Sequence, residues 1–315
     1  MASGRELFRK FLNREPLSRP VFLPMARGLL SRVEDMPMEK LTSDPTLWAN
    51  GIMKTAKLFG FDGVVTGFDF SLMAEACGCD ITWKNDRPIV MSLKGNLSQN
   101  PEQGERMSHA LEAANRLFEA CRLEFACVAA LTGPVTLASQ LFGRDEGQDH
   151  IREVNRPVVQ MVEAFCKTKP DVLIFLEGRP LALAEPNAIH RRIYNTLKNI
   201  ADYYNIPVGL YLQGYDPLRL NQFSSLKMDL YIPGPSFDNR LPPVVELLAL
   251  GEDALGVGLG LPLDNLEKAR KIIREGLQRY HAKAGQGFFL TSFGPAARDV
   301  NLENLHELVT EICTL

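Results

Sequence analysis

Two carboxylates stand at the ends of apolar segments, where a protein can carry out acid–base chemistry. Glu177 follows four consecutive apolar residues at 173–176, and Asp69 lies between Phe68 and Phe70. The flanking phenylalanines indicate that the Asp69 carboxyl is partly desolvated, which would raise its pKa and suit a proton donor. We therefore predict that Glu177 and Asp69 are catalytic. The structural alternatives are a salt bridge from Glu177 to Arg179 and a turn capped by Asp69.

Three further polar side chains are placed to bind a substrate. Tyr211 and Gln213 are two residues apart in an apolar segment, so they share one face if that segment is a strand. Burying a tyrosine and a glutamine is costly without partners, so we predict either a site or hydrogen bonds within the core. Arg27 follows another apolar run. It could clamp an anion or a phenolate, or it could form a surface ion pair.

Eight short apolar runs alternate with longer segments of helical periodicity, which indicates βα units and a parallel sheet. The runs are nearly continuous in apolar character, as is typical of strands buried on both faces. Eight strands in alternation predict an α/β protein with a single (β/α)₈ TIM barrel, whose site lies after the carboxyl ends of the strands. The predicted strands are 20–25, 63–67, 125–131, 171–177, 206–214, 228–233, 254–261 and 287–293, and the predicted helices are 45–59, 102–122, 153–167, 186–204, 263–280 and 302–312.

Two segments depart from this alternation. Residues 1–19 are predicted to form an N-terminal helical arm, which leaves residues 20–315 for the barrel. Residues 80–91, around the sequence Asn-Asp-Arg-Pro at 85–88, are typical of a hairpin after the second strand. The glycine-rich run at 256–260 lacks the spacing of a phosphate-binding loop, so we expect it to permit close approach of other groups to the backbone.

The composition limits the possible partners and compartments. A net charge of −3 provides no general attraction for nucleic acid. No window approaches the length of a membrane span, and the first residues lack the apolar stretch of a signal peptide. The six cysteines are scattered, which indicates a reducing compartment rather than a disulfide scaffold. These features predict a cytoplasmic protein that binds neither nucleic acid nor membrane.

Several segments resemble blocks of the uroporphyrinogen decarboxylase superfamily. Ser-Arg-Pro-Val at 18–21 is similar to its Asp-Arg-x-Pro-Val opening, and residues 60–69 with 75–80 resemble its second-strand block. The most specific likeness is Gly-Pro-Val-Thr-Leu-Ala-Ser at 133–139, which resembles the block after the third strand. Residues 285–290 and 302–305 fit its last strand and helix. The resemblance covers nearly the whole chain and implies a TIM barrel.

The decarboxylating branch of this superfamily uses residues that are only partly present here. The resemblance places its aspartate at Asp69, but its tyrosine position holds Gln140, and residues 288–295 contain no histidine in place of the family's histidine. Its arginine-rich first loop retains only Arg27. A substrate with eight carboxylates needs many cationic partners, so the resemblance argues against decarboxylation of uroporphyrinogen itself.

The other branch contains corrinoid-dependent methyltransferases, among them methylcobalamin:coenzyme M methyltransferases and O-demethylase methyltransferases. The thiol-methylating members bind zinc through a His-x-Cys pair and a later cysteine, which lowers the pKa of a substrate thiol. In this sequence those positions read Tyr211, Gln213 and, for the late cysteine, Gly294. We therefore expect none of the usual zinc ligands. A different metal site formed by Asp69 and Glu177 is left open.

The resemblance and the altered residues together predict a corrinoid-dependent methyltransferase. Its methyl donor would be a small molecule, plausibly a methoxylated aromatic, and the cobalamin would be carried by a partner corrinoid-binding protein. Glu177, Asp69 or Tyr211 would assist the leaving oxygen as a general acid. Two alternatives remain, a decarboxylase of a smaller or tetrapyrrole acid and a non-catalytic partner of a corrinoid protein. The predicted substrate-binding residues are Arg27, Gln140, Arg179, Gln213, Phe68 and Phe293, the two phenylalanines forming part of an aromatic wall.

Overall fold

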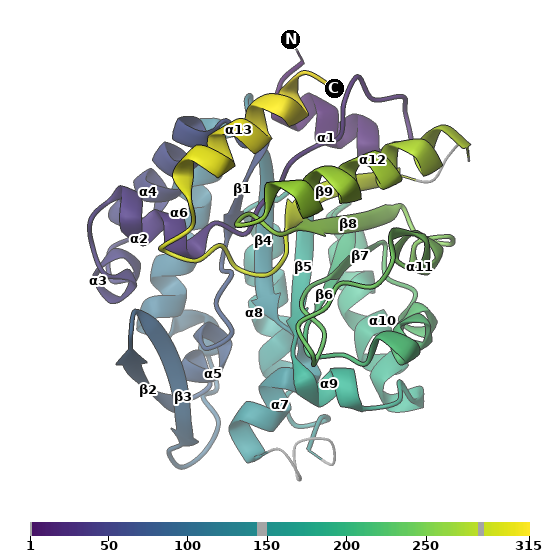
Figure 1. The fold of residues 1–315 in the computed structure, drawn as a ribbon. Helices are drawn as coiled ribbons and strands as arrows, with labels where there is room; N and C mark the ends of the chain where they lie inside the picture. The colour runs from purple at the N-terminus through teal and green to yellow at the C-terminus, as the bar shows by residue number, and fades with distance from the viewer. Residues whose placement is uncertain (1, 144–149, 283–286) are drawn as a thin grey trace.

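The computed structural model describes residues 2–143, 150–282 and 287–315, and these form an α/β barrel (Figure 1). Within these ranges seven parallel strands form one curled sheet, in the order β1-β4-β5-β6-β7-β8-β9. The predicted barrel fold is therefore confirmed, and seven of the eight predicted strands are present. Their bounds are β1 Gly63–Thr66, β4 Ala126–Thr132, β5 Val172–Glu177, β6 Val208–Leu212, β7 Leu230–Pro233, β8 Gly256–Leu261 and β9 Gly287–Ser292.

The predicted first strand, 20–25, is wrong as a regular strand, because only Phe22 forms a bridge, to Leu290 of β9. The segment still fills the gap between β9 and β1. On the β9 side Leu23 N donates to Leu290 O at 2.8 Å. On the β1 side, Phe22 N donates to the Asp62 carboxylate at 2.8 Å instead of to a carbonyl of β1. Pro24, two residues later, has no N–H to donate. A continuous ladder to β1 therefore cannot form.

Helices surround the sheet, and each predicted helix is present with small shifts of its ends. Asp44 caps α4 by accepting from Thr46 N and Leu47 N, and Pro45 fits the first helical position. The helices are α1 Gly4–Leu12, α2 Arg27–Val33, α3 Met38–Thr42, α4 Pro45–Phe59, α5 Leu72–Ala76, α6 Glu105–Cys121, α7 Pro134–Phe142, α8 Asn155–Lys167, α9 Arg179–Leu183, α10 Ala188–Tyr203, α11 Val244–Leu250, α12 Leu266–Ala282 and α13 Leu302–Cys313, with 3₁₀ turns η1 Pro101–Gln103 and η2 Pro217–Leu226.

Helix α1 closes the base of the barrel, at the end opposite α7 and α9 (Figure 1). Its Phe8 and Phe11 pack edge-on against Phe289 of β9, with ring centroids 6.3 and 5.5 Å apart. The glycines of β8 make room for these rings: a Cβ on Gly256 would lie 2.6 Å from Phe11, and one on Gly258 would lie 2.8 Å from Phe289. The expectation of close approach at the glycine-rich run is confirmed.

The predicted hairpin is also confirmed, as β2 Cys79–Lys84 paired antiparallel with β3 Arg87–Leu93. It stands beside the barrel mouth, at the lower left of Figure 1. None of the helices in the described ranges has the length and apolar character needed to cross a membrane.

Asp62 stabilises the segment that closes the barrel. Arg19 donates two hydrogen bonds to its carboxylate at 2.7 Å each, and Phe22 N donates a third. Because the pair is largely buried, Asp62→Ala leaves the Arg19 guanidinium without its partner, and we expect a loss of about 3 kcal/mol in the free energy of unfolding. Urea denaturation measures this loss. Asp62→Asn retains one acceptor oxygen and should lose less, so equal stability of Asp62→Ala and wild type would contradict the assignment.

Candidate functional site

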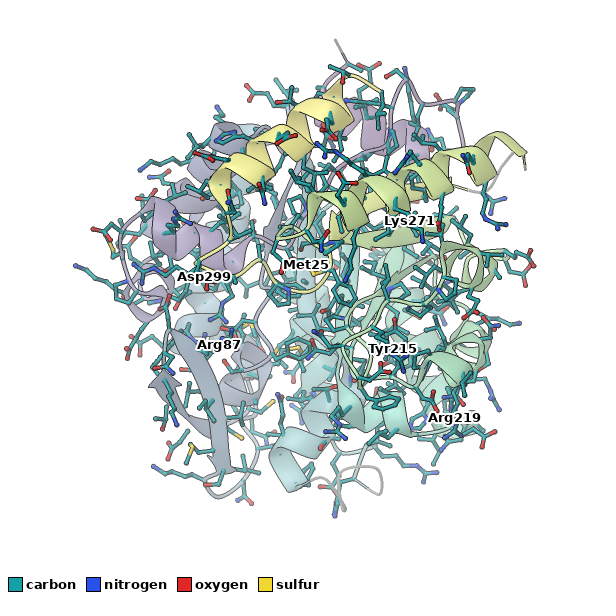
Figure 2. The ribbon with its side chains drawn as sticks, viewed as in Figure 1. Met25, Arg87, Tyr215, Arg219, Lys271 and Asp299 are labelled. Atoms are coloured by element: carbon teal, nitrogen blue, oxygen red, sulfur yellow. The ribbon has the colours of Figure 1, made fainter. Side chains whose placement is uncertain are left out.

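A cleft of about 970 Å³ lies at the carboxyl ends of the strands, between the barrel mouth and the β2–β3 hairpin. Figure 2 shows two of its lining residues, Arg87 on the hairpin and Asp299 after β9, on the same side of the molecule. Its walls combine aromatic rings with charged groups. The lining residues are Arg27, Gly28, Pro37, Met38, Glu39, Phe68, Asp69, Phe70, Ser71, Trp83, Asn85, Asp86, Arg87, Pro88, Gln213, Pro295, Ala296, Ala297, Arg298 and Asp299.

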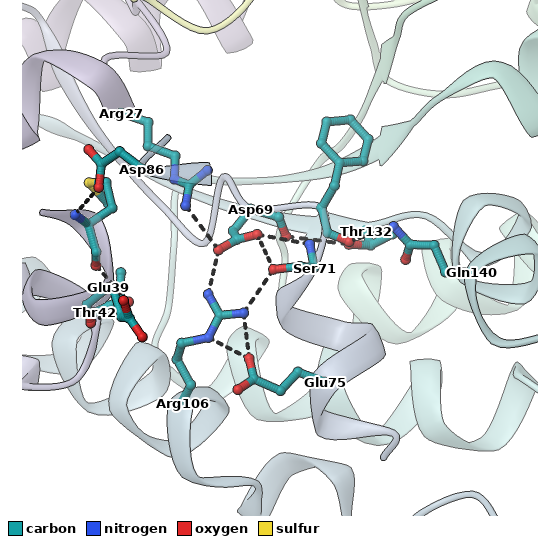
Figure 3. A network of polar contacts seen from close by, with 12 residues as sticks. Arg27, Glu39, Thr42, Asp69, Ser71, Glu75, Asp86, Arg106, Thr132 and Gln140 are labelled. Atoms are coloured by element: carbon teal, nitrogen blue, oxygen red, sulfur yellow. Dashed lines mark hydrogen bonds and ion pairs between the residues drawn. The ribbon is translucent and has the colours of Figure 1, made fainter. Parts of the chain in front are cut away.

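The carboxylate of Asp69 is the centre of a polar network in this cleft. Arg106 Nη1 donates to Asp69 Oδ2 at 2.5 Å, and Arg27 Nη2 approaches the same oxygen at 3.4 Å. The other carboxylate oxygen accepts from the N–H and the hydroxyl of Ser71 at 2.8 and 2.7 Å. Figure 3 shows Arg27 and Arg106 pointing at Asp69 from two sides, with Glu75 holding Arg106 from behind.

The surroundings of Asp69 favour its ionised form, so the expectation that its pKa is raised is wrong. Burial alone would raise the pKa of Asp69, but the charges of Arg27 and Arg106 and the hydrogen bonds from Ser71 outweigh it, so that the pKa is lowered. Trp83 of the hairpin lies over both guanidinium groups, 5.9 Å from Arg27 and 5.5 Å from Arg106. This arrangement allows cation–π attraction to both.

Two side chains, Thr132 and Gln140, bind the backbone of the loop that carries Asp69. Thr132 Oγ1 and Gln140 Nε2 both donate to the carbonyl of Phe70, at 3.1 and 2.9 Å. Gln140, on α7, therefore positions the loop and is not part of the cleft lining. Phe68 does line the cleft, as expected for an aromatic wall, and Phe70 lines it as well.

Tyr211 of β6 and Gln213, one residue beyond the end of β6, point to the same side, as predicted from their spacing. Tyr211 is fully buried and donates to Gln213 Oε1 at 3.4 Å, while Gln213 lines the cleft. Burial raises the pKa of Tyr211, so its phenol stays protonated. The Phe68 and Phe70 rings cover Tyr211, with centroids 5.5 and 6.4 Å away. Gln213 is thus the member of the pair that faces the cleft.

Glu177 is fully buried, and its partners come from α7 and α10 rather than from Arg179. Its carboxylate accepts from Val135 N at 3.0 Å, from Thr136 N at 2.8 Å, and from the hydroxyls of Thr136 and Tyr194. The predicted salt bridge to Arg179 is absent from these contacts. Glu177 lies outside the cleft lining and fastens the first turn of α7 to β5.

This arrangement explains a residue of the block at 133–139. A Cβ on Gly133 would lie 2.2 Å from the Glu177 carboxylate, so only glycine leaves room for that side chain. Burial raises the pKa of Glu177 to about 7, although the four hydrogen bonds that it accepts favour the ionised form and act against the rise. A catalytic role for Glu177 stays a prediction, whereas its contacts are those of a structural clamp.

The remaining predicted residues lie at different distances from the cleft. Arg27 lines it and pairs with buried Asp69, so the alternative of a surface ion pair is wrong. Arg179 is exposed at the start of α9, and half-buried Phe293 packs against Gly260; neither belongs to the lining. Gly294 is buried with a positive φ of 85°. Sequence reasoning brought Arg27, Asp69, Phe68 and Gln213 to one cleft.

The sequence analysis missed Arg106, Ser71 and Trp83. Arg106 follows Asp69 by 37 residues in a mixed polar helix, where nothing in the sequence distinguishes it from the exposed Arg116 of the same helix. Ser71 lies two residues beyond Asp69, and that spacing was the available signal for a local side-chain contact. Trp83 stands in a strand whose residues alternate in burial. Only the packing of the hairpin against the barrel shows that the Trp83 ring covers Arg27 and Arg106.

No group of three or more histidine, cysteine, aspartate or glutamate side chains in the described ranges is arranged to hold a metal ion. Asp69 and Glu177, considered above as an alternative pair of ligands, have separate hydrogen-bond partners on different elements. The polar residues that face the cleft are suited to bind and orient an organic molecule.

Comparison with known proteins agrees with this geometry. A family model described as uroporphyrinogen decarboxylase (URO-D) matches residues 3–174, more than half of the chain. A methyltransferase from Methanosarcina mazei superposes with a TM-score of 0.77 at 18% identity, covering 100% of this chain and 99% of that chain. A B12-independent methionine synthase from Shewanella sp. W3-18-1, in complex with selenomethionine, superposes with a TM-score of 0.56 at 15% identity, covering 85% and 88%. No curated protein matches the chain. At these identities the two structures share the fold with this chain.

The pKa of Glu177 makes stability depend on pH. The folded protein keeps a proton on Glu177 up to about pH 7, whereas the unfolded chain loses it near 4.5. The stabilising contribution is therefore complete below about pH 4.5 and is lost as the pH rises through 7. We expect the free energy of unfolding of wild type, relative to Glu177→Gln, to fall by up to about 3 kcal/mol between pH 5 and pH 8. Urea titrations at several pH values test this, and parallel curves for the two proteins would refute it.

Removal of Arg106 should destabilise the protein far more than removal of another arginine on the same helix. Arg106→Ala leaves the buried Asp69 charge with the more distant Arg27, and we expect a loss of about 3–5 kcal/mol in the free energy of unfolding. Arg116→Ala, the matched control, breaks an exposed pair with Glu112 and should cost less than about 1 kcal/mol. Chemical denaturation compares the two variants. Similar losses would show that the network contributes little.

Proposed function

This chain belongs to the uroporphyrinogen decarboxylase family, and we propose that it is a methyltransferase that moves a methyl group between a small molecule and the corrinoid of a partner protein. The observation that carries this proposal is the composition of the cleft. The rings of Phe68, Phe70 and Trp83 form apolar walls, and the Arg27 guanidinium lies among them. A planar, methoxylated aromatic ring with an anionic substituent or product matches these walls.

Arg27 is the group best placed to meet a developing negative charge. Its hydrogen bond to Asp69 is long, at 3.4 Å, and its side chain, which lines the cleft, keeps 20% of its surface exposed. Asp69 is satisfied at closer range by Arg106 and Ser71, so it orients Arg27 without consuming its donors. Arg27 can therefore form charge-assisted hydrogen bonds to an oxyanion.

The proposed reaction breaks the bond between the methyl carbon and an oxygen of the donor. The electron pair of that bond stays on the oxygen, so the product is a phenolate that must be stabilised or protonated. Arg27 would stabilise this oxygen by its charge, and the amide of Gln213 would donate to it, since Tyr211 occupies the Gln213 Oε1 atom. Tyr211 then acts by orienting Gln213, whereas Asp69, as an anion, orients Arg27.

The corrinoid, when its carrier protein is bound, supplies the cobalt centre that accepts or donates the methyl group. The exposed side chains of Arg87 and Arg298 stand at the edge of the cleft, so the cleft opens to solvent and is accessible to a group presented by another protein. A methyl donor seated against Phe68 and Phe70 would lie at the barrel mouth, where such a carrier could approach.

A second candidate is the decarboxylation of a small acid, favoured by the cations of the cleft. Arg27, Arg87 and Arg298 all line it and could bind a carboxylate, while the carboxylates Glu39 and Asp299 stand exposed in the same lining. A substrate panel distinguishes the two reactions, because decarboxylation releases carbon dioxide without a methyl acceptor.

Methyl transfer can be tested with a panel of methoxylated aromatics and a separately supplied corrinoid protein in its reduced form. We expect demethylated product and a methylated corrinoid, with absorbance of the corrinoid as the measurement. Arg27→Ala should lower kcat/KM by about 100-fold, since removal of a donor to a developing oxyanion costs about that much. Arg27→Lys should retain part of the rate. Arg9→Ala, at the exposed base of the barrel, is the control. A folded protein that transfers no methyl group across the panel would refute the proposal.

A further inference from the structure

The β2–β3 hairpin covers one side of the cleft, and its Trp83, Val90 and Leu93 pack against the core. It forms a separate two-stranded sheet, and a two-stranded hairpin is at best marginally stable in water. Its base is held by the chain: Cys79 pairs with Leu93, and Lys94 N donates to Gly78 O at 3.2 Å. The tip lies at the far end of both strands, so its position depends on contacts made there.

The turn at the tip contains an unusual side chain. Asn85 and Asp86 both have positive φ, 49° and 61°, and they lie between the paired residues Lys84 and Arg87. A two-residue turn of this kind favours glycine at its second position, because glycine adopts positive φ without strain. Aspartate is less favourable than glycine at this positive φ, but it provides a carboxylate that glycine lacks.

That carboxylate binds the opposite wall of the cleft. Ser31 Oγ, on α2, donates to Asp86 Oδ2 at 2.6 Å, and Met38 N, the first residue of α3, donates to Oδ1 at 2.5 Å. The partners are 55 and 48 residues away in sequence. Figure 3 shows Asp86 near Arg27, on the α2–α3 side of the network. Met38 lines the cleft together with residues of the hairpin.

The position of the tip decides where two cleft residues stand. Trp83 is adjacent to the turn and lies over the guanidinium groups of Arg27 and Arg106. Arg87 follows the turn and lines the cleft from the hairpin side. If the tip moves away from α2 and α3, both side chains must move with it.

We propose that Asp86 is a positioning residue that latches the tip of the hairpin across the cleft, and thereby sets the width of the cleft and the places of Trp83 and Arg87. The latch depends on the geometry of the cleft and is the same whichever reaction takes place there. It can therefore be tested without a substrate.

Asp86→Gly is the sharpest test, because glycine suits the backbone of the turn and removes only the carboxylate. If Asp86 mattered only for the turn, this variant would leave the hairpin unchanged or firmer. The latch predicts the opposite, with cleavage by a lysine-specific protease after exposed Lys84 becoming about tenfold faster, a factor that corresponds to about 1.4 kcal/mol. Mass spectrometry measures the rate at which the peptide bond after Lys84 is cleaved. Lys94→Ala, which breaks an exposed pair with Asp80 at the base of the hairpin, is the matched control.

Trp83 provides a spectroscopic readout of the same latch. In a Trp48→Phe background Trp83 is the single tryptophan, and Asp86→Gly should increase quenching of its emission by acrylamide. Ser31→Ala, which removes one of the two hydrogen bonds from the other wall, should give a smaller increase. Asp86→Asn keeps one acceptor oxygen for Met38 N, its amide can donate to Ser31 Oγ, and asparagine tolerates positive φ, so this variant should stay near wild type. Wild-type cleavage at Lys84 and wild-type quenching in folded Asp86→Gly would overturn the proposal.

Discussion

The buried carboxylate of Asp69 is the charge on which the arrangement of the cleft depends. A buried anion is tolerated only when close positive groups and hydrogen-bond donors compensate its loss of water. The charges of Arg27 and Arg106 and the hydrogen bonds from Ser71 provide that compensation, and the longer contact leaves Arg27 with donors facing the cleft. The charge of Asp69 thus fixes one guanidinium in the wall and orients the other toward a ligand.

The scaffold around this network is built to keep it in place. Gln140 and Thr132 hold the loop that carries Asp69, and Glu177 fastens the first turn of α7, which in turn carries Gln140. The residues at 133–139 therefore contribute indirectly, through a helix whose start is fixed by a buried carboxylate. The barrel mouth forms one side of the cleft, and the hairpin, a separate two-stranded sheet, forms the other.

Membership in the uroporphyrinogen decarboxylase family sets the scaffold, while the residues at the mouth set the chemistry. Gln213 and protonated Tyr211 form a neutral hydrogen-bonding pair in the same cleft as the Arg27 guanidinium. Such a site can bind an aromatic molecule and stabilise charge on an oxygen. On this ground we propose methyl transfer from an oxygen rather than a reaction that needs many cationic contacts.

By itself the sequence determined the barrel, because apolar runs, helix caps and turn residues act over a few neighbouring positions. It correctly placed seven strands, the hairpin and the polar face shared by Tyr211 and Gln213, and it brought Arg27 and Asp69 to one end of the sheet. Only the tertiary structure decided which charges meet. Arg106 reaches Asp69 across 37 residues and Asp86 reaches Ser31 across 55. The pKa of a buried carboxyl depends on such partners, so the ionised state of Asp69 and the buried clamp of Glu177 were not readable from their neighbours in the chain.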